Sequence, residues 1–322
     1  MLRVRRMIRH PLSILLLLAL AVVGCQNDRY ARQLVQFDTG YGKVSQTLTG
    51  TPEQLIEQKR IDMHRRVTMD DKIVIDAWVI KAAPPSDQFT TSSGTVVVLH
   101  GLLDSKAGYL SLGQRLSKLG YDVILIDLRA HGASGGQYVT YGAMEKNDVK
   151  AVVDALLKES AARPPVYAFG VSLGGATAIQ YAAIDPRCKG VMAIAPYADA
   201  RDIAKWMMAL SAPLMSNAEF DATLDQAGKL AHFNPAEVSS VEAAKKLTCP
   251  LLLVHGQLDG IVPVDQSQAV YDATKSPKQL IIVPWAGHKT IMLAREDWVA
   301  EQIDHLARTG LATPAEMPEE EE

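Results

Sequence analysis

The sequence predicts an α/β domain with a mostly parallel, doubly wound sheet and a short helical cap inserted late in the chain. Two observations carry this prediction. From residue 95 onward, short continuous apolar runs alternate with segments of helix length, as in parallel sheets that helices cover on both faces. Residues 197–247 interrupt this alternation, and they form too long a stretch for a plain connection.

The leading edge of the sheet is expected to be an antiparallel hairpin. Residues 65–69 and 72–80 are rich in β-forming residues, and Asp70 and Asp71 between them favour a turn. The later strands are expected at residues 96–99, 123–126, 166–169, 191–195, 251–254 and 280–283. The helices that alternate with them are expected at residues 106–119, 144–159, 173–184, 265–273 and 291–306. The count matches one domain over residues 63–310.

The interruption at residues 197–247 is predicted to be a cap of two or three short helices. It is apolar and rich in methionine, with Trp206, Met207 and Met208 in succession. Because flexible apolar side chains adapt to irregular ligands, such an insertion beside a catalytic face favours a substrate pocket. The alternative is a structural excursion without substrate contact.

Charge excludes one class of partner. The formal net charge is −3 at pH 7, so the chain has no basic surplus to neutralise phosphates. We therefore expect no nucleic-acid partner. Residues 311–322 end in four glutamates and are expected to form a disordered acidic tail.

The N-terminus has the layout of a signal peptide, predicted over residues 1–24. A cationic stretch at residues 1–10 precedes an apolar run at residues 11–23 and a small residue, Gly24. The apolar run has thirteen residues, whereas a helix needs roughly 20 to span a bilayer core. Export is therefore expected, and an uncleaved membrane anchor is the alternative.

The residues VVGC that end at Cys25 resemble the lipobox of bacterial lipoproteins. This resemblance implies that Cys25 carries lipid and becomes the mature N-terminus, so the membrane partner would be reached through a lipid anchor. Gln26 and Asn27 follow, without the aspartate that favours the inner membrane in enterobacterial lipoproteins. The resemblance therefore points to a cell-envelope lipoprotein of the outer membrane, facing the periplasm or the surface.

Residues 25–62 are expected to form a tether between this anchor and the domain. Glycines at positions 40, 42 and 50 interrupt any long pattern in this polar segment. One short helix is predicted at residues 52–59, because Thr51 is a good N-cap and a proline follows it.

Ser172 is the candidate nucleophile. It lies in the sequence Gly170-Val171-Ser172-Leu173-Gly174, between a predicted strand and a predicted helix. A sharp strand-to-helix turn holds a serine out at the carboxyl edge of the sheet, and Gly170 and Gly174 leave room for its strained backbone. The Leu173 N–H then lies at a helix N-terminus, where it can donate to a developing oxyanion.

The second oxyanion donor is expected to be the Leu102 N–H, which lies in the loop after the strand at residues 96–99, one residue after His100-Gly101. His100 precedes this loop and is interpreted as bracing it. The charged, glycine-rich run at residues 127–136 follows the next strand. We interpret that run as structural support for the loops and not as catalytic.

Asp259 and His288 are the candidate acid and base. Asp259 follows the strand at residues 251–254, and His288 follows the last predicted strand. The carboxylate would accept a hydrogen bond from one ring nitrogen, which fixes the tautomer and stabilises the imidazolium of the transition state. Asp265 and Asp199 are the alternative candidates for the acid. Asp265 is better explained as a helix N-cap, and Asp199 lies too early in the chain.

Together these motifs resemble the α/β-hydrolase superfamily over roughly residues 63–308, in the group of esterases, acylglycerol lipases and serine aminopeptidases. The resemblance implies the α/β-hydrolase fold and a mechanism without metal or cofactor, in which Ser172 forms an acyl-enzyme and His288 activates water. The expected activity is hydrolysis of a small-molecule carboxylic ester, with no protein partner implied. A serine peptidase or acyltransferase with the same residues is the enzymatic alternative, and a non-catalytic lipoprotein scaffold is the other.

Cys188 and Cys249 form a candidate disulfide. Each falls just before a predicted strand, and in the family's strand order those two strands are neighbours. Adjacent strands lie about 4.8 Å apart, which is within disulfide reach, and export would permit the bridge. Two buried free thiols are the alternative.

Overall fold

The computed structural model describes residues 27–37, 40–84 and 93–311. The predicted signal peptide (residues 1–24), Cys25 and residues 312–322 of the predicted acidic tail lie outside the described residues. In the described ranges, no helix has both the length and the apolar character to cross a membrane.

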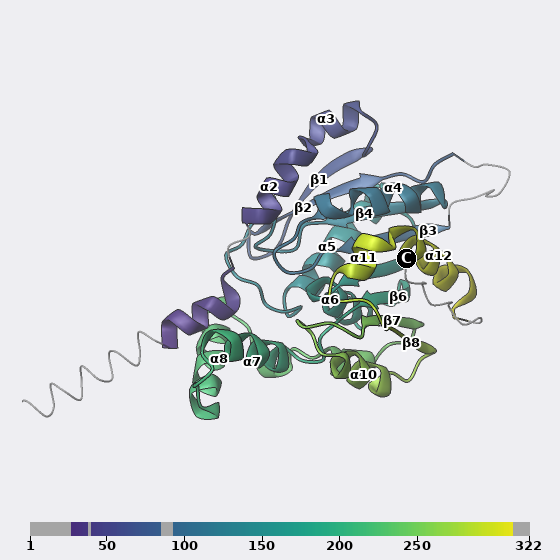
Figure 1. The fold of residues 1–322 in the computed structure, drawn as a ribbon. Coiled ribbons are helices and arrows are strands. Elements are labelled where there is room, and N and C mark those ends of the chain that lie inside the picture. The colour runs from purple at the N-terminus through teal and green to yellow at the C-terminus, as the bar shows by residue number, and fades with distance from the viewer. Residues whose placement is uncertain (1–26, 38–39, 85–92, 312–322) are drawn as a thin grey trace, which may run out of the picture.

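In the described part of the chain, eight strands form one sheet in the order β1-β2-β4-β3-β5-β6-β7-β8 (Figure 1). The strands are β1 (Met63–Thr68), β2 (Val74–Ile80), β3 (Gly94–Leu99), β4 (Tyr121–Ile126), β5 (Val166–Val171), β6 (Cys188–Ile194), β7 (Leu251–Gly256) and β8 (Lys278–Val283). β2 pairs antiparallel with β1 and with β4, and every other pair is parallel. The predicted fold class, with its antiparallel hairpin on the leading edge, is confirmed.

Helices cover both faces of this sheet. Alternate residues of β3 face opposite layers, since Val97 packs with the helices α5 and α6 whereas Val98 packs with α4 and α12. The covering helices are α4 (Leu110–Lys118), α5 (Glu145–Lys158), α6 (Leu173–Ala182), α10 (Val264–Ala273) and α12 (Glu296–Thr309). Strands β3, β4, β5 and β7 are buried throughout because both of their faces are covered, whereas the edge strand β8 is partly exposed.

Two predicted helices are divided. The segment expected at residues 106–119 begins with the 3-10 turn η1 (Lys106–Tyr109) before α4. The segment expected at residues 291–306 consists of α11 (Thr290–Ala294) and α12, with a break at Arg295, whose φ is −137°. In both segments the helical spacing of apolar residues continues across the break. This spacing alone therefore does not show where one helix ends and the next begins.

The segment predicted as a tether is largely helical, which corrects that expectation. An N-terminal helix spans residues 27–35, and α2 (Gly40–Thr49) and α3 (Pro52–Glu57) follow. Thr51 caps α3 as expected, through a capping box with Gln54. The N-terminal helix is packed and not free, because Ala31, Leu34 and Val35 are fully buried in the main core. Their spacing of i, i+3 and i+4 is that of an apolar helix face.

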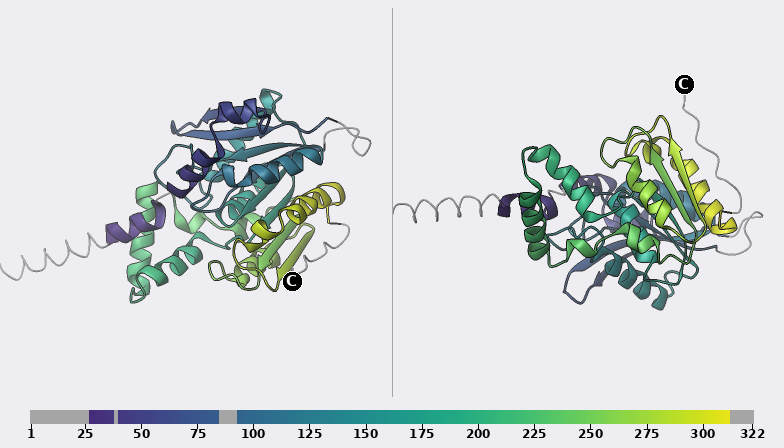
Figure 2. Two further views of the ribbon diagram at one scale, coloured as in Figure 1. Left: turned by 45° about the horizontal axis from the view of Figure 1, so that its top comes forward. Right: turned by 90° about the horizontal axis from the view of Figure 1, so that it is seen from below.

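The predicted cap consists of α7 (Ala200–Ser211), α8 (Asn217–Ala231), the 3-10 turn η2 (Pro235–Glu237) and α9 (Ser240–Ala244). A capping box between Ser216 and Glu219 starts α8. The views in Figures 1 and 2 agree that α7 and α8 extend to one side of the sheet, next to the N-terminal helix.

Cys188 and Cys249 are both buried, and both are free thiols in this structure. They are nevertheless neighbours across β6 and β7, and the hydrogen bond with Cys249, together with burial, raises the pKa of the Cys188 thiol. The expected proximity is therefore found without the bridge, and oxidation to a disulfide stays a prediction.

Candidate active site

Ser172 sits on a strained turn between β5 and α6. Its φ of 55° and ψ of −117° lie where non-glycine residues are rarely found. The turn is forced by close backbone approach on both sides. A Cβ at position 170 would lie 2.2 Å from the carbonyl oxygen of Gly174, and a Cβ at position 174 would lie 2.2 Å from that of Leu99. Both predicted elbow glycines are therefore required by the space around them.

His288 and Asp259 are in direct contact after β8 and β7. The Nδ1 of His288 lies 2.7 Å from the Oδ2 of Asp259. The other carboxylate oxygen accepts the N–H groups of Ile261 and Val262, at 2.8 and 2.9 Å. The competitors lie elsewhere, Asp199 before α7 and Asp265 in the first turn of α10.

A second histidine, His255, also contacts this carboxylate, and sequence reasoning missed it. Its Nδ1 accepts the hydroxyl of Ser267 at 2.7 Å, so its Nε2 carries the proton. That Nε2 donates to the carbonyl of Val262 at 2.8 Å and lies 3.3 Å from the Oδ2 of Asp259. The only signal in the sequence is that His255 lies near the end of the strand, four residues before the aspartate.

These donors keep the carboxylate ionised. Burial alone would raise the pKa of Asp259, but the hydrogen bonds from His255 and His288 outweigh it, and the N–H of Val262 adds to their effect. The pKa of Asp259 therefore lies well below its usual range. An anionic Asp259 holds the proton of His288 on Nδ1 and leaves Nε2 as a proton acceptor.

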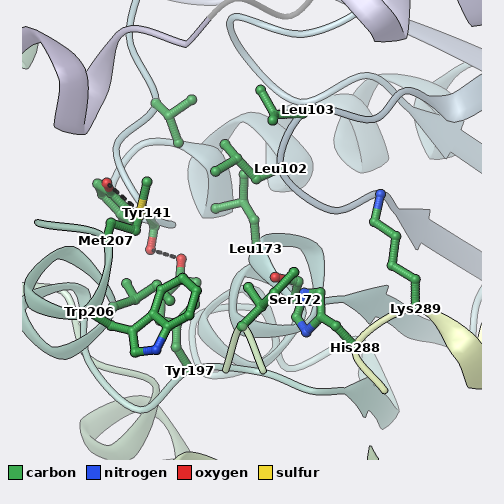
Figure 3. Close-up of a pocket in the computed structure, with 13 residues that line it drawn as sticks. Leu102, Leu103, Tyr141, Ser172, Leu173, Tyr197, Trp206, Met207, His288 and Lys289 are labelled. Atoms are coloured by element: carbon green, nitrogen blue, oxygen red, sulfur yellow. Dashed lines mark hydrogen bonds between the residues drawn. The ribbon is translucent and has the colours of Figure 1, made fainter. Parts of the chain in front are cut away.

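Ser172 and His288 meet at the floor of a cavity of about 430 Å³. Figure 3 shows the Ser172 hydroxyl beside the imidazole ring of His288. Ser172 is 8% exposed, so its hydroxyl is reached through this cavity. The structure thus brings together the three residues that the sequence proposed for proton transfer and nucleophilic attack.

The two predicted oxyanion donors line the same cavity. Neither the N–H of Leu102 nor that of Leu173 has a hydrogen-bond acceptor among the residues that the structure describes. Leu173 is the first residue of α6, so its N–H points out of the helix end. Two unpaired N–H groups beside a serine are the arrangement that a developing oxyanion needs.

The loop of Leu102 is held in place by two buried histidines. Leu103 has a φ of 64° and donates its N–H to the Nε2 of His131 at 3.3 Å. His100 donates to the carbonyl of Gly101 and accepts the N–H of Leu128. Burial and the neighbouring His100 lower the pKa of His131 to about 3, so it remains a neutral acceptor. The run at residues 127–136 has the supporting role expected of it.

The wall of the cavity is apolar and comes from several distant segments. Tyr141 lies between β4 and α5, Tyr197 follows β6, and α7 supplies Trp206 and Met207 (Figure 3). The hydroxyl of Tyr197 donates to the carbonyl of Tyr141 at 3.0 Å. No sequence motif marks Tyr141 or Tyr197 as a lining residue.

Charge at the cavity is confined to one side. Lys289 lies across His288 from Trp206 (Figure 3), and its Nζ is 3.3 Å from a carboxylate oxygen of Asp104. Among the described residues that line the cavity, none is a carboxylate. In the same described part of the chain, no group of three or more His, Cys, Asp or Glu residues is arranged to hold a metal ion.

Comparisons with known proteins agree with this fold. Residues 90–243 match the profile of a family described as serine aminopeptidase, S33. The uncharacterised protein YqkD of Bacillus subtilis is 28% identical over 203 residues, which cover 60% of this chain and 64% of that protein. The monoacylglycerol lipase of Mycolicibacterium smegmatis is 27% identical over 264 residues, which cover 72% of this chain and 91% of the lipase.

The fold of the chain is also similar to those of solved structures. The Pyrococcus furiosus esterase Pf2001 superimposes with a TM-score of 0.61 at 24% identity, covering 79% of this chain and 95% of the esterase. The chain therefore has an α/β-hydrolase-like fold, with an eight-stranded, mostly parallel sheet in its described part.

Proposed function

We propose that the protein is a serine hydrolase that cleaves carboxylic esters. The observation that carries this proposal is the contact of 2.7 Å between His288 and Asp259 at the cavity that also holds the strained Ser172. A base oriented by a buried carboxylate beside a serine is the arrangement that activates a hydroxyl group for attack on a carbonyl.

The proposed reaction has two halves. In the first, Oγ of Ser172 bonds to the ester carbonyl carbon while its proton passes to Nε2 of His288. The bond to the alcohol oxygen then breaks, and His288 gives that proton to the departing alcohol. In the second, water attacks the acyl-enzyme, again through His288, and the acid leaves as Ser172 regains its proton. The N–H groups of Leu102 and Leu173 bind the oxyanion in both halves.

The cavity favours an acyl chain as the substrate group. Its wall is built from aromatic and aliphatic side chains such as Tyr141, Trp206 and Met207, which bind apolar groups by burying them. The similarity to a monoacylglycerol lipase and to an esterase supports the same class of substrate.

Peptide hydrolysis is the second candidate, because the matching family is described as serine aminopeptidase. An aminopeptidase needs an acceptor for the ammonium group of its substrate, and a carboxylate is the strongest one. The described lining of the cavity offers no carboxylate. The ester is therefore the better fit.

The proposal includes a place in the cell envelope. The signal peptide at residues 1–24 and the lipobox at Cys25 support export and lipid anchoring. The enzyme would then face the periplasm or the surface from the outer membrane, where acyl esters are abundant. Metabolic labelling with a fatty-acid analogue tests the anchor, since Cys25→Ser should abolish the label.

Ester turnover tests the activity. The full chain in detergent is assayed with p-nitrophenyl esters of increasing acyl length, beside Ser172→Ala and Ser117→Ala. Ser117 is a matched control, because it is 7% exposed where Ser172 is 8% exposed and it lies in α4. We expect Ser172→Ala to lose about 10⁴-fold or more in kcat and Ser117→Ala to retain turnover. Full activity in Ser172→Ala, or cleavage of aminoacyl anilides alone, would contradict the proposal.

A further inference from the structure

The tip of the cap exposes apolar side chains to water. Between Trp206 and Ala218 the chain carries no charged residue. In this stretch, where α7 ends and α8 begins, Leu210 is 70% exposed and Leu214 is 96% exposed. An exposed leucine is common singly, but an uncharged tip with two of them marks a surface that contacts an apolar partner.

The N-terminal helix lies beside this tip. A hollow of about 350 Å³ is lined by Asn27 and Tyr30 of the helix together with Pro213, Leu214 and Met215 of the tip. Asn27 is the first described residue, and it follows the predicted acylation site Cys25 by two positions. The chain that leads to the proposed lipid anchor therefore starts from the hollow in which Leu214 lies.

The same helix also reaches the wall of the catalytic cavity. The carbonyl of Val35 accepts the N–H of Val139 at 2.8 Å, and the carbonyl of Leu34 accepts the hydroxyl of Tyr141 at 2.5 Å. Val139 and Tyr141 both line the cavity. Helix α7 also connects the cap tip with the cavity. Trp206 lines the cavity, and Leu210, one helical turn later, is exposed at the tip.

We propose that the cap tip, Leu210 and Leu214 with the adjoining start of the N-terminal helix, docks on a lipid surface, and that the substrate is an acyl ester held in that surface. The substrate part of this inference rests on the proposed ester hydrolase function. A lipid anchor at Cys25 would hold the start of the helix at the membrane, so the tip beside it would meet the acyl-chain boundary. The cavity, one helical turn away on α7, would then open towards lipid-borne esters.

Tryptophan fluorescence tests the docking. The full chain is reconstituted into phosphatidylcholine vesicles with brominated acyl chains, as Leu214→Trp and as Leu48→Trp. Leu48 is a matched control because it is likewise highly exposed, at 83%, but lies in α2 and not in the tip. We expect the tryptophan from Leu214→Trp to lie about 5–10 Å into the boundary of headgroups and acyl chains. Because the chain has four native tryptophans, each variant is compared with the unaltered chain. The emission added at position 214 should lie at shorter wavelength and be quenched by bromine, whereas the emission added in the control should show neither effect.

Activity tests the choice of substrate. We expect the double variant Leu210→Glu, Leu214→Glu to lose about tenfold in hydrolysis of a long-chain ester carried in vesicles, with turnover of soluble p-nitrophenyl acetate unchanged. Leu48→Glu should change neither rate. If the unaltered chain hydrolyses no ester, the proposed function fails while the fluorescence result still decides the docking.

Three results would overturn the docking proposal. One is equal quenching of the two tryptophans. A second is a shielded tryptophan at position 214 in the Cys25→Ser chain without detergent or vesicles, which would mean that the chain covers its own tip. The third is a change of oligomeric state in Leu214→Glu, which would assign the tip to a second copy of the protein.

Discussion

The loops after β3, β5, β7 and β8 and the wall of the cavity are built by different means. In these loops, which form the catalytic edge, polar atoms are held by many hydrogen bonds over short stretches of chain. Asp259 alone contacts two histidines and two backbone N–H groups. The wall is apolar, and its parts meet over long separations, since Leu34 and Tyr141 are 107 residues apart.

This difference indicates that the edge and the wall have separate functions. In the proposed reaction, the edge contains the groups that would move protons and bind the oxyanion, and these would act on any ester that reaches Ser172. The wall contains Tyr141, Tyr197, Trp206 and Met207, which in the proposed complex would touch the acyl chain and not the reacting bond. Changes at the edge should therefore alter the rate for all esters, whereas changes at the wall should alter which ester is preferred.

The largest effect is expected from Asp259→Asn at the edge. The amide has no negative charge to stabilise the imidazolium of His288, and it can favour the wrong tautomer. We expect kcat to fall about 10³–10⁴-fold for every acyl length, measured with p-nitrophenyl esters. Circular dichroism should show an unchanged fold. A loss smaller than tenfold in a folded variant would mean that Asp259 does not orient the base.

A smaller loss is expected from His255→Leu, which leaves no N–H donor in place of the Nε2 that faces Asp259. Removing a hydrogen bond to a charged group costs about 1.5–3 kcal/mol, or roughly 10–100-fold in rate. Because one of the donors that lower the pKa of Asp259 is lost, this pKa should rise towards its usual range. The acid limb of the kcat/KM profile should then move to higher pH.

Ser267→Ala is the control for this prediction. It removes the contact with Nδ1 of His255 but leaves Nε2 facing Asp259. Its pH profile should stay close to that of the unaltered enzyme. If His255→Leu lowers activity without moving the acid limb, His255 supports only the loop.

At the wall, Met207→Ala should change selectivity more than rate. The smaller side chain lengthens the apolar cavity, so the ratio of kcat/KM for long over short acyl chains should rise roughly tenfold. Met208→Ala is a matched control, because Met208 is its neighbour in α7 but is buried in the core and does not line the cavity. An equal shift in both variants would show that Met207 acts only through stability.

The smallest effect concerns stability at acid pH. The folded pKa of His131 is about 3, below the value of about 6.5 for an unfolded chain. Between these values only the unfolded chain binds the proton, so stability is complete above pH 6.5 and falls as the pH decreases towards 3. We expect His131→Gln to remove about 1.4 kcal/mol per pH unit from this slope, measured by urea unfolding at pH 4.5, 5.5 and 6.5. Parallel slopes would contradict a neutral, buried His131.

The sequence predicts the edge better than the wall for a physical reason. A strand, a glycine and a reactive side chain lie within a few residues of one another, so Ser172, Asp259 and His288 can be selected from local patterns. The contact of His255 with Asp259 needs the loop conformation, which the local pattern does not give. Tyr141 and the N-terminal helix join the cavity only through tertiary packing, and no local pattern could place them there.

The central claim is that Ser172 is an activated nucleophile. The most direct measurement is reaction of the full chain with a fluorophosphonate, followed by mass spectrometry of its peptides. We expect one adduct, on the peptide that contains Ser172, which is absent in Ser172→Ala and forms far more slowly in Asp259→Asn. A folded protein that forms no adduct, or an adduct on another residue, would contradict the account.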